Sequence, residues 1–125
     1  MLKLVARYFR ARDDRGTLEG LVNFGDWREM NLVSSRAGSV RGDHYHRDTR
    51  EIFIILDGEI RAAAQAVEDG RLVGPVEQLV VAPGDVVLVE PLTNHTFEVV
   101  QDARWINALS RRIDPTAPDI LRALR

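Results

Sequence analysis

Residues 38–58 read GSVRGDHYHRDTREIFIILDG, and they contain the strongest β-strand signal of the chain. Glu51–Leu56 is a compact run of β-branched and aromatic residues that is too short for an ordinary helix. Asp57 and Gly58 follow at once, and such a pair favours a tight turn between two strands. We therefore predict a β-hairpin in which residues 51–56 pair with residues 59–66.

The rest of the chain consists of short β-prone runs separated by turn signals, several of which contain glycine or proline. They lie at residues 5–9, 17–22, 29–35, 75–81, 86–89, 96–100 and 104–109. About ten strands at this regular spacing predict an all-β sandwich or a small barrel. Helix is expected in two places only, around Asp26–Arg28 and in a short C-terminal helix that begins at Pro118 and ends at Leu124.

Composition limits the class of protein. The 125 residues, 45% hydrophobic and 29% charged, fit one globular domain, residues 1–125, with a core of its own. The chain has no cysteine, which excludes iron–sulfur clusters, thiol nucleophiles and disulfide scaffolds. A net charge of -2 argues against a nucleic-acid partner. Because no segment approaches the about 20 apolar residues of a membrane helix, we expect no membrane partner and a cytoplasmic location.

The three histidines form one pattern with a glutamate. His44 and His46 are separated by one residue, so on a strand both side chains leave the same face, and Glu51 follows five residues later. His95 opens a segment in which it shares a face with Phe97. Three imidazoles and one carboxylate suit a single divalent transition metal such as Zn, Mn, Fe or Ni. The alternative is that His44 and His46 lie on the surface and His95 is an ordinary core residue.

The spacing of these residues resembles a known motif. Gly38, five residues, His44, Tyr45, His46, four residues, Glu51, six residues and Gly58 is similar to the first motif of the cupin superfamily. Residues 84–99 resemble the second motif in part, through Gly84, Pro91 and His95. The resemblance implies a double-stranded β-helix, or jelly-roll barrel, with His44, His46, Glu51 and His95 as metal ligands.

A finer resemblance concerns the segment Arg41–His46. It is similar to the Arg-Gly-x-His-aromatic stretch of deoxysugar 3,5-epimerases, and more so to the C-terminal cupin domain of capsular-polysaccharide sugar-nucleotide enzymes. In the metal-free epimerases the histidine that matches His44 is the catalytic base, whereas in the capsular enzymes it is a metal ligand. The presence of His46, Glu51 and His95 favours the ligand role.

These resemblances imply an enzyme that epimerises or isomerises a small-molecule substrate at the carbonyl of a sugar or nucleotide sugar. An Fe(II)-dependent dioxygenase and a non-catalytic module that binds carbohydrate or carboxylate are the alternatives. No general base is assigned. Candidates for substrate contact are Arg36 and Arg41, as forks for an anion, and Phe97 and Trp105, as an apolar wall.

The oligomeric state is expected to be a homodimer. The strand at residues 52–56 is apolar on both faces, whereas a jelly roll buries one face of each sheet. Its outer face therefore needs a cover, for which the C-terminal helix and a partner chain are the two candidates. Short cupins that this chain resembles pair through sheet faces or exchanged N-terminal strands.

Overall fold

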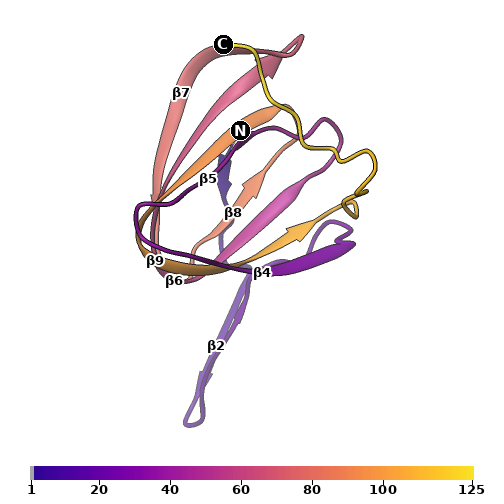
Figure 1. Ribbon diagram of the computed structural model, residues 1–125. Coiled ribbons are helices and arrows are strands. Elements are labelled where there is room, and N and C mark those ends of the chain that lie inside the picture. The colour runs from indigo at the N-terminus through magenta and orange to yellow at the C-terminus, as the bar shows by residue number, and fades with distance from the viewer. Residues whose placement is uncertain (1) are drawn as a thin grey trace.

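The computed structural model describes residues 2–125, and its regular structure is antiparallel β throughout (Figure 1). Seven strands form one sheet in the order β1-β8-β6-β9-β4, with β5 paired to β9 and β7 paired to β6, and β2 and β3 form a separate ribbon. The strands are β1 (Leu2–Leu4), β2 (Phe9–Asp13), β3 (Gly16–Gly20), β4 (Glu29–Ser35), β5 (Val40–His44), β6 (Glu51–Glu68), β7 (Arg71–Val81), β8 (Val86–Val89) and β9 (Thr93–Leu109).

Two long strands, β6 and β9, turn the sheet into a jelly roll. The first part of β6 pairs with β8 and its second part with β7, while β9 pairs with β5 through its first part and with β4 through its last. Both strands therefore cross from one wall of the barrel to the other (Figure 1). The predicted jelly-roll fold is confirmed.

The prediction of a tight turn at Asp57 and Gly58 is wrong. Strand β6 runs through both residues, and residues 59–66 pair with residues 93–101 of β9 instead of folding back on residues 51–56. The register shifts on both sides of Asp57, and Gly58 has a φ of 90°. A Cβ at Gly58 would lie 2.5 Å from the carbonyl oxygen of Asp102. Glycine is therefore needed at this bulge, where β6 and β9 approach closely.

Neither expected helix is present among residues 2–125. Residues 26–28 have no regular structure and follow a bend at Phe24 and Gly25, and Asp26 and Arg28 form an exposed ion pair. The tail is extended: Leu121 forms a bridge with Tyr45, and Leu124 forms one with Arg71. Its backbone groups bond to the barrel rather than to one another, which is why no helix follows Pro118. Within the same residues no helix is long and apolar enough to cross a membrane.

The core has two parts, inside and outside the sheet. The inner cluster fills the barrel and includes Phe53, Ile60, Phe97 and Trp105. The outer cluster consists of Ile52, Val86 and Leu88, packed against Val5, Leu21, Val22, Trp27 and Ile54. The chain's own N-terminal segment thus covers the outer face of β6, and neither the predicted tail helix nor a partner chain is needed there.

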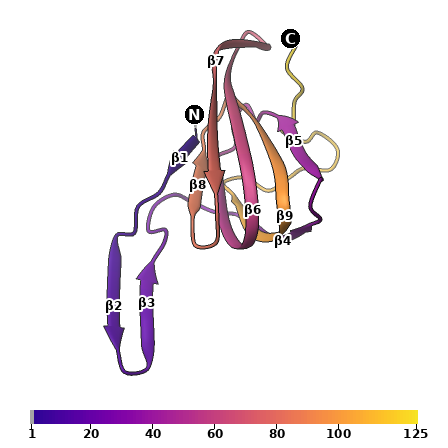
Figure 2. The same cartoon turned by 90° about the vertical axis from the view of Figure 1, so that its left-hand side faces the viewer.

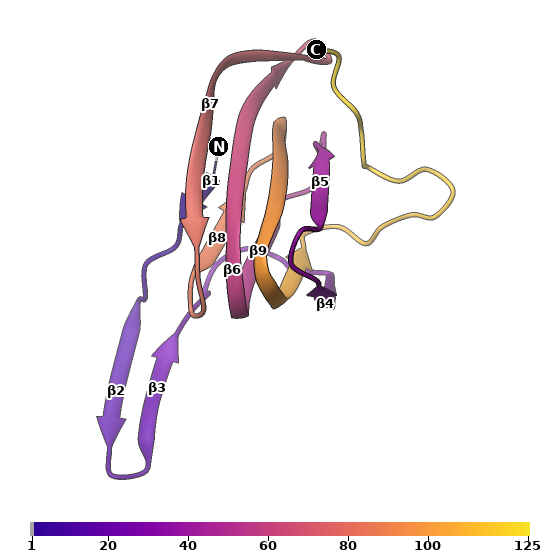
Figure 3. The ribbon, with the colours of Figure 1, turned by 60° about the vertical axis from the view of Figure 1, so that its left-hand side comes forward.

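The ribbon of β2 and β3 projects away from the barrel (Figures 2 and 3). Ala11 pairs with Leu18 across the ribbon, and Phe9 lies two residues before Ala11, so these three side chains share one face. Phe9 is 49% exposed and Leu18 65% exposed. The ribbon therefore presents an apolar face that the rest of its own chain leaves open.

Candidate metal centre

Four predicted ligands meet inside the barrel. His44 ends β5 and pairs with His95 of β9, Glu51 begins β6, and His46 lies in the loop between β5 and β6. His46, Glu51 and His95 are buried and His44 is half-buried, so neither member of the His44/His46 pair is a free surface residue. One ligand nitrogen from each histidine lies within 4.8 Å of the other two. The ring centroids are 4.8 to 5.3 Å apart, which makes a nearly equilateral triangle.

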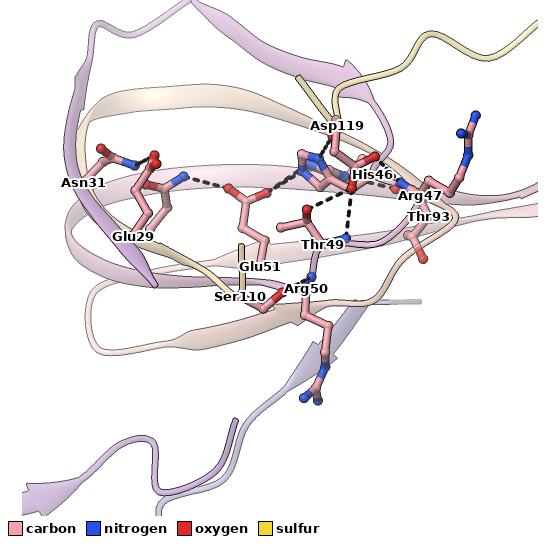
Figure 4. Close-up of polar contacts among 12 residues, drawn as sticks. Glu29, Asn31, His46, Arg47, Thr49, Arg50, Glu51, Thr93, Ser110 and Asp119 are labelled. Carbon is pink, nitrogen blue, oxygen red and sulfur yellow. Dashed lines mark hydrogen bonds and ion pairs between the residues drawn. The ribbon is translucent and has the colours of Figure 1, made fainter. Parts of the chain in front are cut away.

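Backbone carbonyls orient two of the rings. The Nδ1 atom of His46 lies 2.6 Å from the carbonyl oxygen of Asp119, and the Nδ1 atom of His95 lies 3.0 Å from that of Thr93. A proton on each Nδ1 satisfies these acceptors, so both Nε2 atoms face the interior. They lie 3.0 Å (His46) and 3.5 Å (His95) from the same oxygen, Oε1 of Glu51 (Figure 4).

The electrostatics of the group differ from residue to residue. Burial, reinforced by the neighbouring His95 and His46, lowers the pKa of His44 to about 4, so this ring is neutral near pH 7. For His46, burial opposes charge but the hydrogen bonds to Glu51 and to the Asp119 carbonyl outweigh it and raise the pKa. Burial would raise the pKa of Glu51, yet its hydrogen bonds to His46 and His95 hold it well below the usual range.

The donor set fits a divalent cation. Both ring nitrogens of His46 face acceptor oxygens, which is the environment of an imidazolium, and a metal ion would take the place of the proton on Nε2. Glu51 supplies the negative charge. The hydrogen bonds from Nδ1 of His46 and His95 to backbone carbonyls are of the kind that orients metal-bound imidazoles in proteins. A cation at this place would compete with a proton at His46, so its binding would strengthen as the pH rises through the raised pKa of His46.

The centre lines a cavity of about 230 Å³. Its walls contain His44, Glu51 and His95, together with the aromatic side chains of Phe53, Phe97 and Trp105 and the polar side chains of Arg41 and Asn107. Phe97 and Trp105 are almost fully buried, so they belong to the core and line the cavity at the same time. Arg41 is held by the hydroxyl of Ser35 and the carbonyl of Ser34.

Arg36 does not belong to this cavity. It lines a separate surface pocket with Asp57, Asp102 and Arg104, among others. Its side chain is therefore not placed to meet a ligand that reaches the histidines, and the structure groups it with none of the other predicted substrate contacts.

Sequence comparison adds a family to this geometry. Residues 11–109 match the model of a family described as the polysaccharide biosynthesis C-terminal domain. The chain belongs to this family. The resemblance to cupins expected from the sequence is confirmed. Among curated proteins, no sequence match to this chain is found.

Solved structures with the same fold are similar to this chain at low sequence identity. The capsular polysaccharide assembling protein CapF of Staphylococcus aureus has a TM-score of 0.70 at 21% identity, over 98% of this chain and 35% of its own. A dTDP-4-dehydrorhamnose 3,5-epimerase of Sulfolobus tokodaii has 0.71 at 20%, over 86% and 69%. A 3,4-ketoisomerase of Helicobacter canadensis has 0.76 at 16%, over 97% and 90%. This chain thus spans about a third of CapF.

Two residues of the site, Asn107 and Asp119, are not predicted from the sequence. Asn107 donates its side-chain N–H to Oε2 of Glu51 at 2.7 Å, while its own buried Oδ1 has no hydrogen-bond partner among residues 2–125. Strand alternation places Asn107 on the same face as Trp105, so a signal for it existed. Asp119, whose carbonyl orients His46, has no signal because it lies in an apparently ordinary tail.

The backbone geometry near this centre requires glycine at position 42. Its φ is 87°, and a Cβ there would lie 2.6 Å from the carbonyl oxygen of His95. Glycine therefore allows β5 to approach β9 closely at the register shift between Gly42 and His44. That close approach brings His44 beside His95.

Proposed function

We propose that this chain is a metal-binding cupin enzyme of the epimerase or isomerase type, acting at the carbonyl of a sugar or nucleotide-sugar substrate. The observation that carries the proposal is the convergence of three imidazoles and the Glu51 carboxylate beside a cavity with aromatic walls, which is lined by His44, His95 and Glu51. The family description supports a role in polysaccharide biosynthesis. The named activities of the structural neighbours, a 3,5-epimerase and a 3,4-ketoisomerase, support the reaction class.

The ligand set of the proposed centre is His44, His46, Glu51 and His95. A divalent metal held there supplies Lewis-acid polarisation of a carbonyl oxygen, which makes the adjacent C–H bond more acidic. Glu51 is held for this task by Asn107, which bonds its outer oxygen and leaves Oε1 directed at the histidines.

The rest of the cavity fits a sugar ring. The unpartnered Oδ1 of Asn107 is a hydrogen-bond acceptor for a ligand hydroxyl, because a buried acceptor without a partner is unfavourable. The rings of Phe53, Phe97 and Trp105 line the same cavity and offer apolar surface to the faces of a sugar ring. A cavity of about 230 Å³ is smaller than sites for drug-sized ligands, so the nucleotide part would lie outside it. Arg41, at the lining, offers a cation for the phosphates.

A metal-free epimerase is the second candidate, and one observation favours it. His44 faces the cavity, and no hydrogen bond to its ring is present within residues 2–125. Because the pKa of His44 is lowered to about 4, the ring is neutral near pH 7 and able to accept a proton. In this alternative His44 takes the proton from the carbon next to the substrate carbonyl, as the resemblance to deoxysugar epimerases implies.

Solvent exchange tests the proposed function. We expect the protein, incubated with dTDP-4-keto-6-deoxyglucose in D2O, to incorporate deuterium next to the carbonyl, as measured by mass spectrometry. Under the first candidate, chelation abolishes exchange and added metal restores it. Under the second, exchange survives chelation and is lost in His44→Asn. The absence of exchange with metal-loaded protein would show that neither candidate acts on this substrate.

We also propose a homodimer, for which the projecting ribbon is the support. A two-stranded ribbon is marginally stable alone, and Phe9 and Leu18 leave it with an open apolar face. Met30 and Leu32 of β4 are 66% and 63% exposed, and in the proposed dimer these side chains of one copy pack against the ribbon of the other.

We expect light scattering at micromolar concentration to give the mass of the dimer, and the substitution Leu18→Asp to shift it to that of the monomer. Val80→Asp, at a site on β7 that is 58% exposed, is the control; a monomeric wild type contradicts the proposal.

A further inference from the structure

We infer that the C-terminal strap, residues 119–125, is a positioning element that holds His44 and His46 in place for a metal. The inference rests on the proposed metal centre. The strap lies outside residues 11–109, the part that matches the family, and the sequence alone predicts a short helix there. Figure 3 shows the tail leaving the end of β9, looping outward and returning past β5 toward the start of β7.

The strap contacts the segment after His46 through one residue. The carboxylate of Asp119 accepts hydrogen bonds from the backbone N–H groups of Arg47, Asp48 and Thr49, at 2.8 to 3.0 Å, and from the Thr49 hydroxyl at 2.8 Å. The backbone carbonyl of Asp119 meets Nδ1 of His46 at 2.6 Å (Figure 4). One residue thus fixes both the loop that carries His46 and the orientation of its ring.

The strap also contacts the segment before His46. Tyr45 and Leu121 exchange two backbone hydrogen bonds of 2.9 Å, which places the strap antiparallel to the His44–His46 segment. Arg122 donates to the carbonyl of Asp43 at 2.7 Å, and Arg125 bonds the Asp43 carboxylate. Both arginine side chains are largely exposed, so their ion pairs contribute little. The backbone pairing and Asp119 supply most of the restraint.

This restraint is needed because the sheet holds the segment on one side only. β5 pairs with β9, but β5 ends at His44, and His46 lies beyond the last ladder pair. On the barrel side, the His46 carbonyl accepts one bond from the N–H of Leu92. The strap provides the contacts on the opposite side. Loss of such supporting contacts around metal ligands typically weakens metal binding by about 10- to 100-fold.

Zinc titration of the full chain tests the inference. We expect Asp119→Ala to weaken Zn²⁺ binding about 10- to 100-fold in competition with a chromophoric chelator. The matched control is Asp114→Ala, in the same tail, because the Asp114 carboxylate bonds Thr116 within the tail itself. That variant should bind Zn²⁺ like the wild type. A folded Asp119→Ala protein with wild-type zinc affinity would overturn the inference.

A spectroscopic readout separates positioning from stability alone. The ¹⁵N shifts of the His46 ring in metal-free wild-type protein should report a proton on Nδ1. Asp119→Ala keeps the backbone carbonyl but removes the carboxylate that holds the loop after His46, so the ring should move relative to that carbonyl and its shifts should change. If Asp119→Ala does not fold, Asp119→Asn, which keeps one acceptor oxygen, is measured in the same way. If the wild type binds no Zn²⁺, the proposed metal centre fails, but the ring signal still decides whether the strap positions His46: unchanged shifts in the variant overturn that role.

Discussion

His95→Ala is expected to lower the affinity for Zn²⁺ by more than the about 10- to 100-fold that loss of a supporting contact costs, because it removes one of the four proposed ligands. His95 is 2% exposed, its Nδ1 is fixed by Thr93, and its Nε2 faces Glu51, so no neighbouring side chain replaces it. The fold should persist, because the apolar strands supply most of the stability. Chelator competition measures the affinity, and circular dichroism checks the fold.

The control for His95→Ala is Phe97→Leu. Phe97 lies on the same strand face and lines the same cavity, but it offers no ligand atom. A change to another hydrophobic residue of similar size costs little in a core, so zinc affinity should stay within a few-fold of the wild type. Equal affinities of His95→Ala and wild type would remove His95 from the centre.

Gly42→Ala is the second substitution with a large expected effect. Its Cβ would lie 2.6 Å from the His95 carbonyl oxygen, which belongs to the backbone and cannot rotate away. β5 must then move from β9 and take His44 with it. We expect metal-free Gly42→Ala to lose more than about 3 kcal/mol in free energy of unfolding, near the upper end for single substitutions, and to bind Zn²⁺ weakly.

Gly38→Ala is a closely matched control for Gly42→Ala. Gly38 has a φ of 88°, almost the same as Gly42, but a Cβ there meets nothing within 4 Å. Both variants carry the cost of an alanine at positive φ, about 1 to 2 kcal/mol, and only Gly42→Ala adds the clash. Equal losses in urea unfolding would show that the close approach of β5 to β9 does not require glycine.

Local pattern was sufficient to predict the fold class and the main ligand candidates. The β-branched run Glu51–Leu56 is a strand, and the alternation from His95 to Val99 places His95 and Phe97 on the inner face. Asp57 and Gly58 were misinterpreted because a glycine bulge and a hairpin turn have the same local sequence. What distinguishes them is pairing with residues of β9 such as Arg104 and Gln101, far away in the chain, which local propensity does not contain.

The supporting residues were harder to predict, for a related reason. Asn107 follows Trp105 by two positions, so its inward direction is predictable, but its bond to Glu51 depends on the register of β6 and β9. Asp119 after Pro118 has the pattern of a helix start, yet its carboxylate accepts the N–H groups of Arg47, Asp48 and Thr49. Long-range hydrogen bonding therefore outweighs the helix signal of a seven-residue tail.

The metal content of the purified protein tests the central claim most directly. Wild type and His95→Ala are produced without an affinity tag, dialysed together, and analysed by inductively coupled plasma mass spectrometry. A metal centre at His44, His46, Glu51 and His95 predicts close to one divalent transition-metal ion per wild-type chain and a small fraction of that in His95→Ala. A wild-type protein with no more metal than His95→Ala, even after incubation with Zn²⁺, Mn²⁺, Fe²⁺ or Ni²⁺, would contradict it.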